Sequence, residues 1–167
     1  NKESNEIVIN KTITGFFKII GVDGLSTGNI KRIVNAEYDN IPKIIKMTKE
    51  DFLQVDGFKE KLATKISIGI KEQLKKVTLP ELMQATNIFG RGFGEKRFSI
   101  ILSKEPTILT SKVSNVEKIN KVKIINGMAE KSANKFVEHI DEFIKWIIKA
   151  ELEYKLDELN TLSETID

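Results

Sequence analysis

The sequence contains no cysteine and a single histidine, His139, among its 167 residues. Without cysteine the chain forms no disulfide and offers no thiolate to zinc, and one imidazole alone does not build a histidine metal site. Carboxylates would have to hold any metal, but neighbouring acids such as Glu50–Asp51 and Asp141–Glu142 have the pattern of solvated helix faces. We therefore expect no metal site and no catalytic residue in this chain.

Long apolar runs are also absent. No segment approaches the ~20 apolar residues that span a bilayer, and residues 1–6 lack the apolar core and the cleavage pattern of a secretory signal. Hydrophobic residues make up 40% of the chain and the mean hydropathy is −0.22, values typical of a soluble globular protein. We expect an intracellular protein, in the cytoplasm, nucleoid or nucleus, with no membrane partner. A start at Asn1 also fits a domain excised from a longer chain.

The charge is unevenly distributed along the chain. Residues 150–167 contain six acids and one base, which leaves 26 bases and 18 acids in residues 1–149, an excess of eight positive charges. A basic body with an acidic tail suits a polyanionic partner, although a solvated lysine-rich surface is an equally common cause. Leucines keep helical spacing through the tail, so residues 150–167 are predicted to form an acidic C-terminal helix or a linker.

One glycine recurs at a regular interval. The segments 22–30, 55–63, 90–98 and 125–133 share the pattern x-x-Gly-apolar-x-x-(Lys/Gly)-x-apolar, centred on Gly24, Gly57, Gly92 and Gly127. These glycines are 33, 35 and 35 residues apart. A fixed interval of this length indicates an internal structural repeat.

Helical signals flank each of these glycines. Residues 48–51 and 114–117 have the pattern of helix starts, the second that of a capping box. Apolar residues recur at helical spacing after each glycine, for example over residues 133–147, and strand signals are nearly absent apart from residues 7–9. Each repeat is therefore predicted to consist of a helix, a tight turn and a second helix.

Two prolines group the repeats in pairs. Pro42 lies between the first and second glycine turns and Pro106 between the third and fourth, and each is predicted to begin a short connector helix. The predicted fold is all-α, with four repeats over residues 12–149. These repeats form two double-hairpin units, residues 12–76 and 77–149, after an N-terminal extension at residues 1–11.

Such a turn suits the binding of phosphate. Glycine allows a positive φ, and the helix that follows presents amides without internal partners at the positive end of its dipole. The apolar residue after each glycine is predicted to anchor the turn between its helices: Leu25, Phe58, Phe93 and Met128. Because backbone amides read no base edges, the expected binding is independent of DNA sequence and sensitive to salt.

Basic and hydroxyl side chains near the turns complete the predicted site. Lysines follow three of the glycines within one helical turn, whereas the first repeat has Gly28 at that position. There we expect amides and the hydroxyls of Ser26 and Thr27 to bind the phosphate instead. The third turn is the most basic, and Asp23 and Asp56 make the first two less favourable. The predicted phosphate-binding residues are Gly24, Ser26, Thr27, Gly28, Gly57, Lys59, Lys61, Arg91, Gly92, Gly94, Lys96, Arg97, Gly127 and Lys131.

These four repeats resemble the helix-hairpin-helix domain of NAD-dependent DNA ligases. The resemblance covers about residues 12–148 and is carried by segments 21–25, 53–63 and 87–97. It implies a domain that grips the minor groove on both sides of a nick during DNA replication and repair, with the remaining ligase domains in cis as partners. The implied ligand is duplex or nicked DNA.

Other ligase motifs are missing from this chain. Two segments superficially resemble the Lys-x-Asp-Gly adenylation motif, but the position of the nucleophilic lysine holds Gly21 or Gln54, and neither forms a lysyl adenylate. The four cysteines of the family's zinc finger are absent, and no complete BRCT domain follows. The chain is therefore expected to be no enzyme and to bind no cofactor by itself, with NAD implied only for a full-length ligase.

Three other functions fit parts of the pattern. A stand-alone module for branched or damaged DNA would also use paired turns, and it would prefer a four-way junction. A helix-hairpin-helix glycosylase needs a catalytic lysine or aspartate after one turn, where this chain only continues with the next repeat. The acidic neighbours of Gly24 and Gly57 make the first pair the better candidate for a surface that docks another protein.

Overall fold

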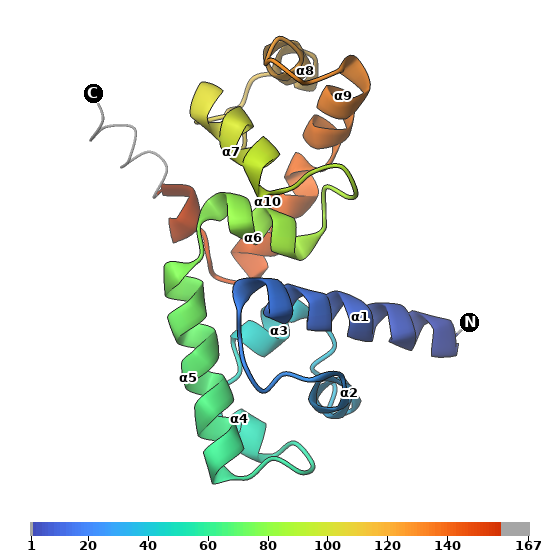
Figure 1. The fold of residues 1–167 in the computed structure, drawn as a ribbon, viewed down its shortest axis with the longest axis vertical. Coiled ribbons are helices and arrows are strands. Elements are labelled where there is room, and N and C mark those ends of the chain that lie inside the picture. Colours follow the sequence, from blue (N-terminus) through green and yellow to red (C-terminus); the bar gives the residue numbers. More distant parts are fainter. Residues whose placement is uncertain (1, 158–167) are drawn as a thin grey trace. The chain divides into compact units, whose positions relative to one another are not determined.

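The computed structural model describes residues 2–157, and these residues form α-helices joined by turns (Figure 1). The helices are α1 (Lys2–Ile20), α2 (Thr27–Asn35), α3 (Ile41–Ile45), α4 (Lys49–Leu53), α5 (Glu60–Lys76), α6 (Leu79–Thr86), α7 (Glu95–Lys104), α8 (Asn115–Lys123), α9 (Glu130–Glu138) and α10 (Ile140–Lys149). No strand occurs within residues 2–157, so the prediction of an all-α fold is confirmed. No helix in that range is long and apolar enough to cross a membrane.

The chain divides into two compact units between Val77 and Thr78. The first unit contains α1 to α5, and the second contains α6 to α10. Each unit holds two pairs of consecutive helices in contact: α1 with α2 and α4 with α5 in the first unit, and α6 with α7 and α8 with α9 in the second. The glycine turns join the two helices of each pair.

Phenylalanine rings form the core of the second unit. The Phe89 ring centroid lies 5.1 Å from those of Phe98 and Phe136 and 5.7 Å from that of Phe143. All four residues are at most 1% exposed. These rings therefore pack in the core between turn 3 and the helices α7, α9 and α10 and form no surface for stacking bases.

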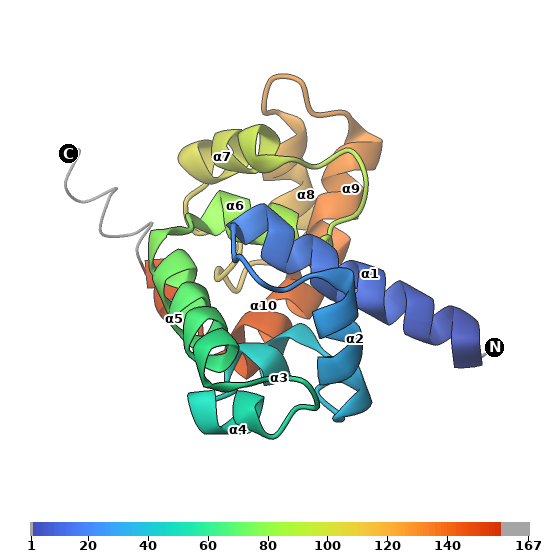
Figure 2. The same cartoon turned by 60° about the horizontal axis from the view of Figure 1, so that its bottom comes forward.

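The core of the first unit is built by all five of its helices, including α3, which buries Ile41 and Ile44. The buried rings of Phe16 and Phe17 meet edge to face at 5.1 Å, and Phe52 of α4 stacks on Phe58 at 6.1 Å. Residues 2–11 form the beginning of α1, whose N-terminal end runs past α2 in both views (Figures 1 and 2). This end of α1 exposes Ile7 and Val8.

Side-chain caps begin five of the helices. Ser26, Asn40, Thr48, Thr78 and Ser114 each accept a hydrogen bond from a first-turn amide. The capping box predicted at Ser114 is wrong, because the structure has only the Glu117 amide donating to Ser114 Oγ. The reciprocal box is instead at Thr48, where the shorter carboxylate of Asp51 accepts from the Thr48 amide at 2.9 Å. The rotamer of the acid at the third position, which the sequence does not specify, decides whether the second bond closes.

Only one of the two predicted connector helices forms. Pro42 lies in the first turn of α3, which Asn40 caps, so this prediction is confirmed. The prediction at Pro106 is wrong, because residues 106–110 form hydrogen-bonded turns, with the Ser111 amide donating to the Thr107 carbonyl at 2.7 Å. The residue before Pro106 is Glu105, which is the C-cap of α7 and leaves no free cap for a new helix.

The second unit ends after α10. Glu151 has a positive φ of 60°, which stops the helix, and Leu152 and Lys155 are buried. One more helical turn covers residues 154–157. The rest of the predicted acidic segment, residues 158–167, lies outside the described residues.

Candidate nucleic-acid interface

Four turns connect the helix pairs, and we number them in chain order: turn 1 (residues 21–26), turn 2 (54–59), turn 3 (87–94) and turn 4 (124–129). Their central glycines have φ values of 92°, 83°, 94° and 87°, a region that side chains disfavour: Gly24, Gly57, Gly92 and Gly127. The next helix begins at the third residue after each glycine. The predicted order of turn and helix is confirmed at all four positions.

The apolar residue after each glycine fixes the turn to the core. Leu25, Phe58, Phe93 and Met128 are between 5% and 8% exposed. In turns 2 and 4 the amides of Phe58 and Met128 also donate to carbonyls three residues earlier, at 3.0 Å. The predicted anchoring role is confirmed, and it leaves the backbone after the turn at the surface.

The helices that follow turns 2, 3 and 4 lack side-chain caps. Their N-cap residues are Lys59, Gly94 and Ala129, and none of them provides a capping hydrogen bond. The first backbone bonds within these helices reach back from residues 63, 98 and 133, so the earlier amides have no partner inside the helix. An acceptor from outside, such as a phosphate oxygen, has three helix starts available.

Turn 1 differs from the other three. Ser26 Oγ already accepts from the Asn29 amide at 3.2 Å, and Asn29 Nδ2 donates to the Gly24 carbonyl at 2.7 Å. A Cβ on Gly24 would lie 3.2 Å from Ile66 Cγ1, so α5 packs against this turn. Turn 1 is thus closed by its own cap and its neighbour, whereas the predicted residues Thr27 and Gly28 are the first residues of α2 and lie exposed.

Turns 3 and 4 are the most open. A Cβ on Gly92 or Gly127 would meet no atom within 4 Å. In turn 3 one amide is already used, because Glu95 N–H donates to Gln84 Oε1 at 3.0 Å. Gln84 lies eleven residues earlier in α6, and no pattern in the sequence indicated this contact.

The charge at each turn depends on the residues of that turn and not on the net charge of its unit. Residues 1–77 contain 14 bases and 10 acids and residues 78–149 contain 12 bases and 8 acids, so the two segments have the same excess of four. The predicted cations at turns 2 to 4 lie exposed at the surface: Lys59, Lys61, Arg91, Lys96 and Lys131. Arg97 is half-buried, with its guanidinium 5.8 Å from the Phe93 ring centroid. Arg97 therefore also contributes to packing.

Acids also lie near the helix starts. Asp23 and Asp56 are exposed beside turns 1 and 2. Glu60, the first residue of α5, forms an ion pair with Lys49 of α4. The hydrogen bond that the Lys49 ammonium donates to Glu60, opposed in part by desolvation, raises the pKa of Lys49 above its ordinary value. This pair neutralises one acid at turn 2.

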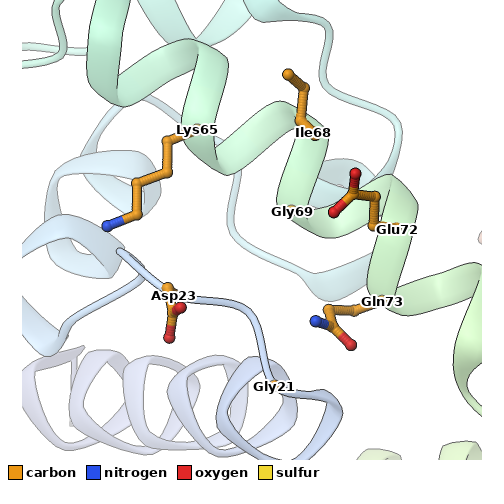
Figure 3. A pocket seen from close by; sticks show the side chains of 7 residues that line it. All are labelled: Gly21, Asp23, Lys65, Ile68, Gly69, Glu72 and Gln73. Atoms are coloured by element: carbon orange, nitrogen blue, oxygen red, sulfur yellow. The ribbon is translucent and has the colours of Figure 1, made fainter.

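A lysine from another helix pair lies on turn 3. Lys135 of α9 donates from Nζ to the Arg91 carbonyl at 2.8 Å, and Nζ lies 5.9 Å from the Phe93 ring centroid. In the first unit, a pocket of about 300 Å³ has Lys65 of α5 beside Gly21 and Asp23 of turn 1 (Figure 3). Neither lysine was among the predicted residues. Among residues 2–157 no three His, Asp or Glu side chains gather to hold a metal ion.

The fold and these turns define a helical domain with paired glycine turns. Each helix after turns 2, 3 and 4 begins with a glutamate that a lysine follows directly: Glu60, Glu95 and Glu130. No known protein-family profile matches the chain. It is 42% identical over 144 residues to a DNA ligase of Acanthamoeba polyphaga mimivirus, an alignment that covers 85% of this chain and 23% of the relative.

Two further relatives are also named as ligases. A putative DNA ligase of Invertebrate iridescent virus 3 is 30% identical over 65% of this chain and 14% of its own length. One of Invertebrate iridescent virus 6 is 26% identical over 82% of this chain and 21% of its own length. The chain therefore spans less than a quarter of each of these relatives. The similarity supports a DNA-ligase-related domain.

Proposed function

We propose that this chain binds the backbone of duplex DNA through turns 2, 3 and 4, without reading the base sequence. The observation that carries the proposal is the missing cap at the three helix starts that follow these turns. Most other helices with a described start use a serine, threonine or asparagine cap. A phosphate oxygen would satisfy the same amides, and exposed lysines or arginines lie at each of these turns.

We further propose that the turns belong to four helix-hairpin-helix repeats, and that the domain clamps a nick as part of an NAD-dependent DNA ligase. The similarity to viral DNA ligases supports the ligase context, and the pairing of turns within each unit supports the repeat. Adenylation and NAD binding would then be functions of other domains in cis, because this chain carries no Lys-x-Asp-Gly motif. The implied partners are nicked or continuous duplex DNA and those domains.

Binding of the 167-residue chain to fluorescently labelled duplexes tests the proposal. Anisotropy is measured at several KCl concentrations for a continuous duplex, a nicked duplex of the same sequence and a duplex of scrambled sequence. If each of the three turns neutralises one phosphate, the slope of log K against log salt is about −3. Equal affinity for the two continuous sequences is expected, and tighter binding of the nicked duplex would support the clamp.

Two matched triple variants test whether DNA binding depends on the lysines at the turns or only on the total positive charge of the chain. One variant changes the lysine of each proposed turn to glutamine, and the other removes the same charge from exposed lysines on other helices. The first set is Lys61→Gln, Lys96→Gln and Lys131→Gln, and the second is Lys18→Gln, Lys46→Gln and Lys145→Gln. We expect the first set to flatten the salt dependence far more than the second. Equal effects of the two sets, or a flat salt response of the unchanged chain, would contradict the proposal.

A further inference from the structure

Lys135 is held against turn 3 by a hydrogen bond and by an aromatic ring, and it lies close to the backbone of a third residue. Its ammonium donates to the Arg91 carbonyl at 2.8 Å, although the two residues are 44 positions apart. The ammonium also lies 5.9 Å from the Phe93 ring centroid, and a Cβ on Gly90 would lie 3.1 Å from both Cε and Nζ of Lys135. The second helix of one pair therefore supplies a cation to the turn of the other pair.

The geometry leaves this ammonium able to bind a further acceptor. An ammonium has three N–H donors, and the bond to Arg91 uses one of them. The lysine is half-buried, so its stem is already ordered by packing. A charge that is fixed before DNA arrives loses less side-chain entropy on binding than a freely rotating surface lysine.

The same arrangement recurs in the first unit. Arg32 stands eight residues after Gly24, and its Nη1 would lie 3.0 Å from a Cβ on Gly57 in turn 2. Lys65 stands eight residues after Gly57, and its side chain extends from α5 toward the loop that carries Asp23 in turn 1 (Figure 3). Both side chains thus reach the turn of the other helix pair in their unit.

Lys135 occupies the equivalent place in the fourth repeat, eight residues after Gly127. The third repeat is the exception, because Ile100 stands eight residues after Gly92 and is 47% exposed. Three of the four repeats therefore carry a cation to a turn that belongs to another repeat. In the first unit each helix pair provides a cation to the turn of the other, and in the second unit only α9 does so.

We propose that Lys135 is a phosphate-binding residue of turn 3, provided by the neighbouring helix pair. Together with the exposed cations Arg91 and Lys96, it makes turn 3 the main DNA-contacting turn of the second unit. This inference rests on the proposed binding of duplex DNA. A purely structural tie between the two helix pairs is the competing explanation for the bond to Arg91.

The test compares Lys135→Met and Lys135→Arg with a matched control, Lys145→Met on α10. Methionine keeps the packed stem beside Phe93 but removes the charge and the hydrogen bond. One lost phosphate contact reduces the steepness of the log K against log salt line by about 0.9. If the variant and the unchanged chain bind equally at 1 M salt, the variant then binds about eightfold more weakly at ~0.1 M salt. We expect this loss for Lys135→Met, recovery of most of it in Lys135→Arg, and little change for Lys145→Met. Thermal melting of the same samples reports the structural role separately.

The outcomes separate the inference from the proposal beneath it. A smaller salt slope in Lys135→Met, while the control keeps the full slope, supports a phosphate contact. An unchanged slope overturns the inference, whether or not the melting temperature falls, and leaves DNA binding by the other cations intact. If the unchanged chain shows no salt-dependent binding to duplex DNA, both the inference and the proposed function fail.

Discussion

Adding a cap at turn 4 should stabilise the fold and weaken the binding of DNA. Ala129 is the exposed N-cap of α9, with φ −83° and ψ 161°. Ser26, which caps α2, has nearly the same conformation, with φ −68° and ψ 167°. In the Ala129→Ser variant the new hydroxyl is therefore placed to accept from the Ser132 amide, three residues on, as Ser26 does from Asn29.

The two effects should be similar in size. A serine cap in place of alanine stabilises a helix by about 1 kcal/mol, within a range of about 0.5–2 kcal/mol. A phosphate that takes the same amide must first displace the hydroxyl, so binding loses about the same free energy. A loss of about 1 kcal/mol corresponds to about fivefold weaker affinity. The salt slope should stay the same, because no charge is removed.

Thermal melting and DNA anisotropy on the same protein samples measure both quantities. For a chain of this length, about 1 kcal/mol raises the melting temperature by about 2–4 °C. Ser114→Ala is the matched control, because Ser114 caps α8, which does not follow a glycine turn. It should lower stability by a similar amount without changing affinity. An Ala129→Ser variant that is more stable and binds DNA as tightly as the unchanged chain would refute the competition for this amide.

Three further predictions concern the other turns and the core. The double variant Gly92→Val, Lys96→Glu should weaken DNA binding more than Gly24→Val, because turn 3 is open and basic whereas turn 1 is capped and covered. Equal losses of affinity in anisotropy titrations would reject the predicted ranking of the two turns. The ion pair with Glu60 raises the pKa of Lys49 above 10.5, so it stabilises the folded state fully below that pH and loses this effect as the pH rises through the folded-state pKa. Above about pH 10.5, the Lys49→Met variant should therefore lose less stability than the unchanged chain as the pH rises, which melting curves measure. Phe89→Ala should destabilise the second unit by about 3–5 kcal/mol in urea unfolding, because the ring centroids of four other phenylalanines lie within 6.5 Å of this ring. A loss below about 1 kcal/mol would contradict the packing.

The local features of the turns were predictable from the sequence. A glycine that needs a positive φ, an apolar residue after it and a helix start three residues on are all determined by neighbours in the chain. The structure confirms these features at Gly24, Gly57, Gly92 and Gly127. The prediction of a connector helix at Pro106 was wrong because Glu105, which would cap that helix, is already the C-cap of α7. A proline in the sequence does not show whether the residue before it is available as a cap.

Contacts between repeats were not predictable in the same way. Lys135 of the fourth repeat contacts Arg91 of the third across 44 residues, and even within the third repeat Gln84 reaches the Glu95 amide from a different helix. The cations at the eighth position after Gly24, Gly57 and Gly127 are visible in the sequence, but their role depends on how two pairs of helices pack. A repeat pattern predicts the structure of each repeat, but it does not by itself predict which repeat contributes a side chain to the turn of another.

Amide chemical shifts of the ¹⁵N-labelled chain, followed while duplex DNA is added, test the central claim most directly. The claim predicts that the largest shifts are in the first helical turns after turns 2, 3 and 4, at residues 60–62, 96–97 and 130–132. The first-turn amides at the capped starts of α3, α6 and α8 should shift little. Shifts concentrated at those capped helices, or spread over the surface without preference for turns 2 to 4, would contradict the account.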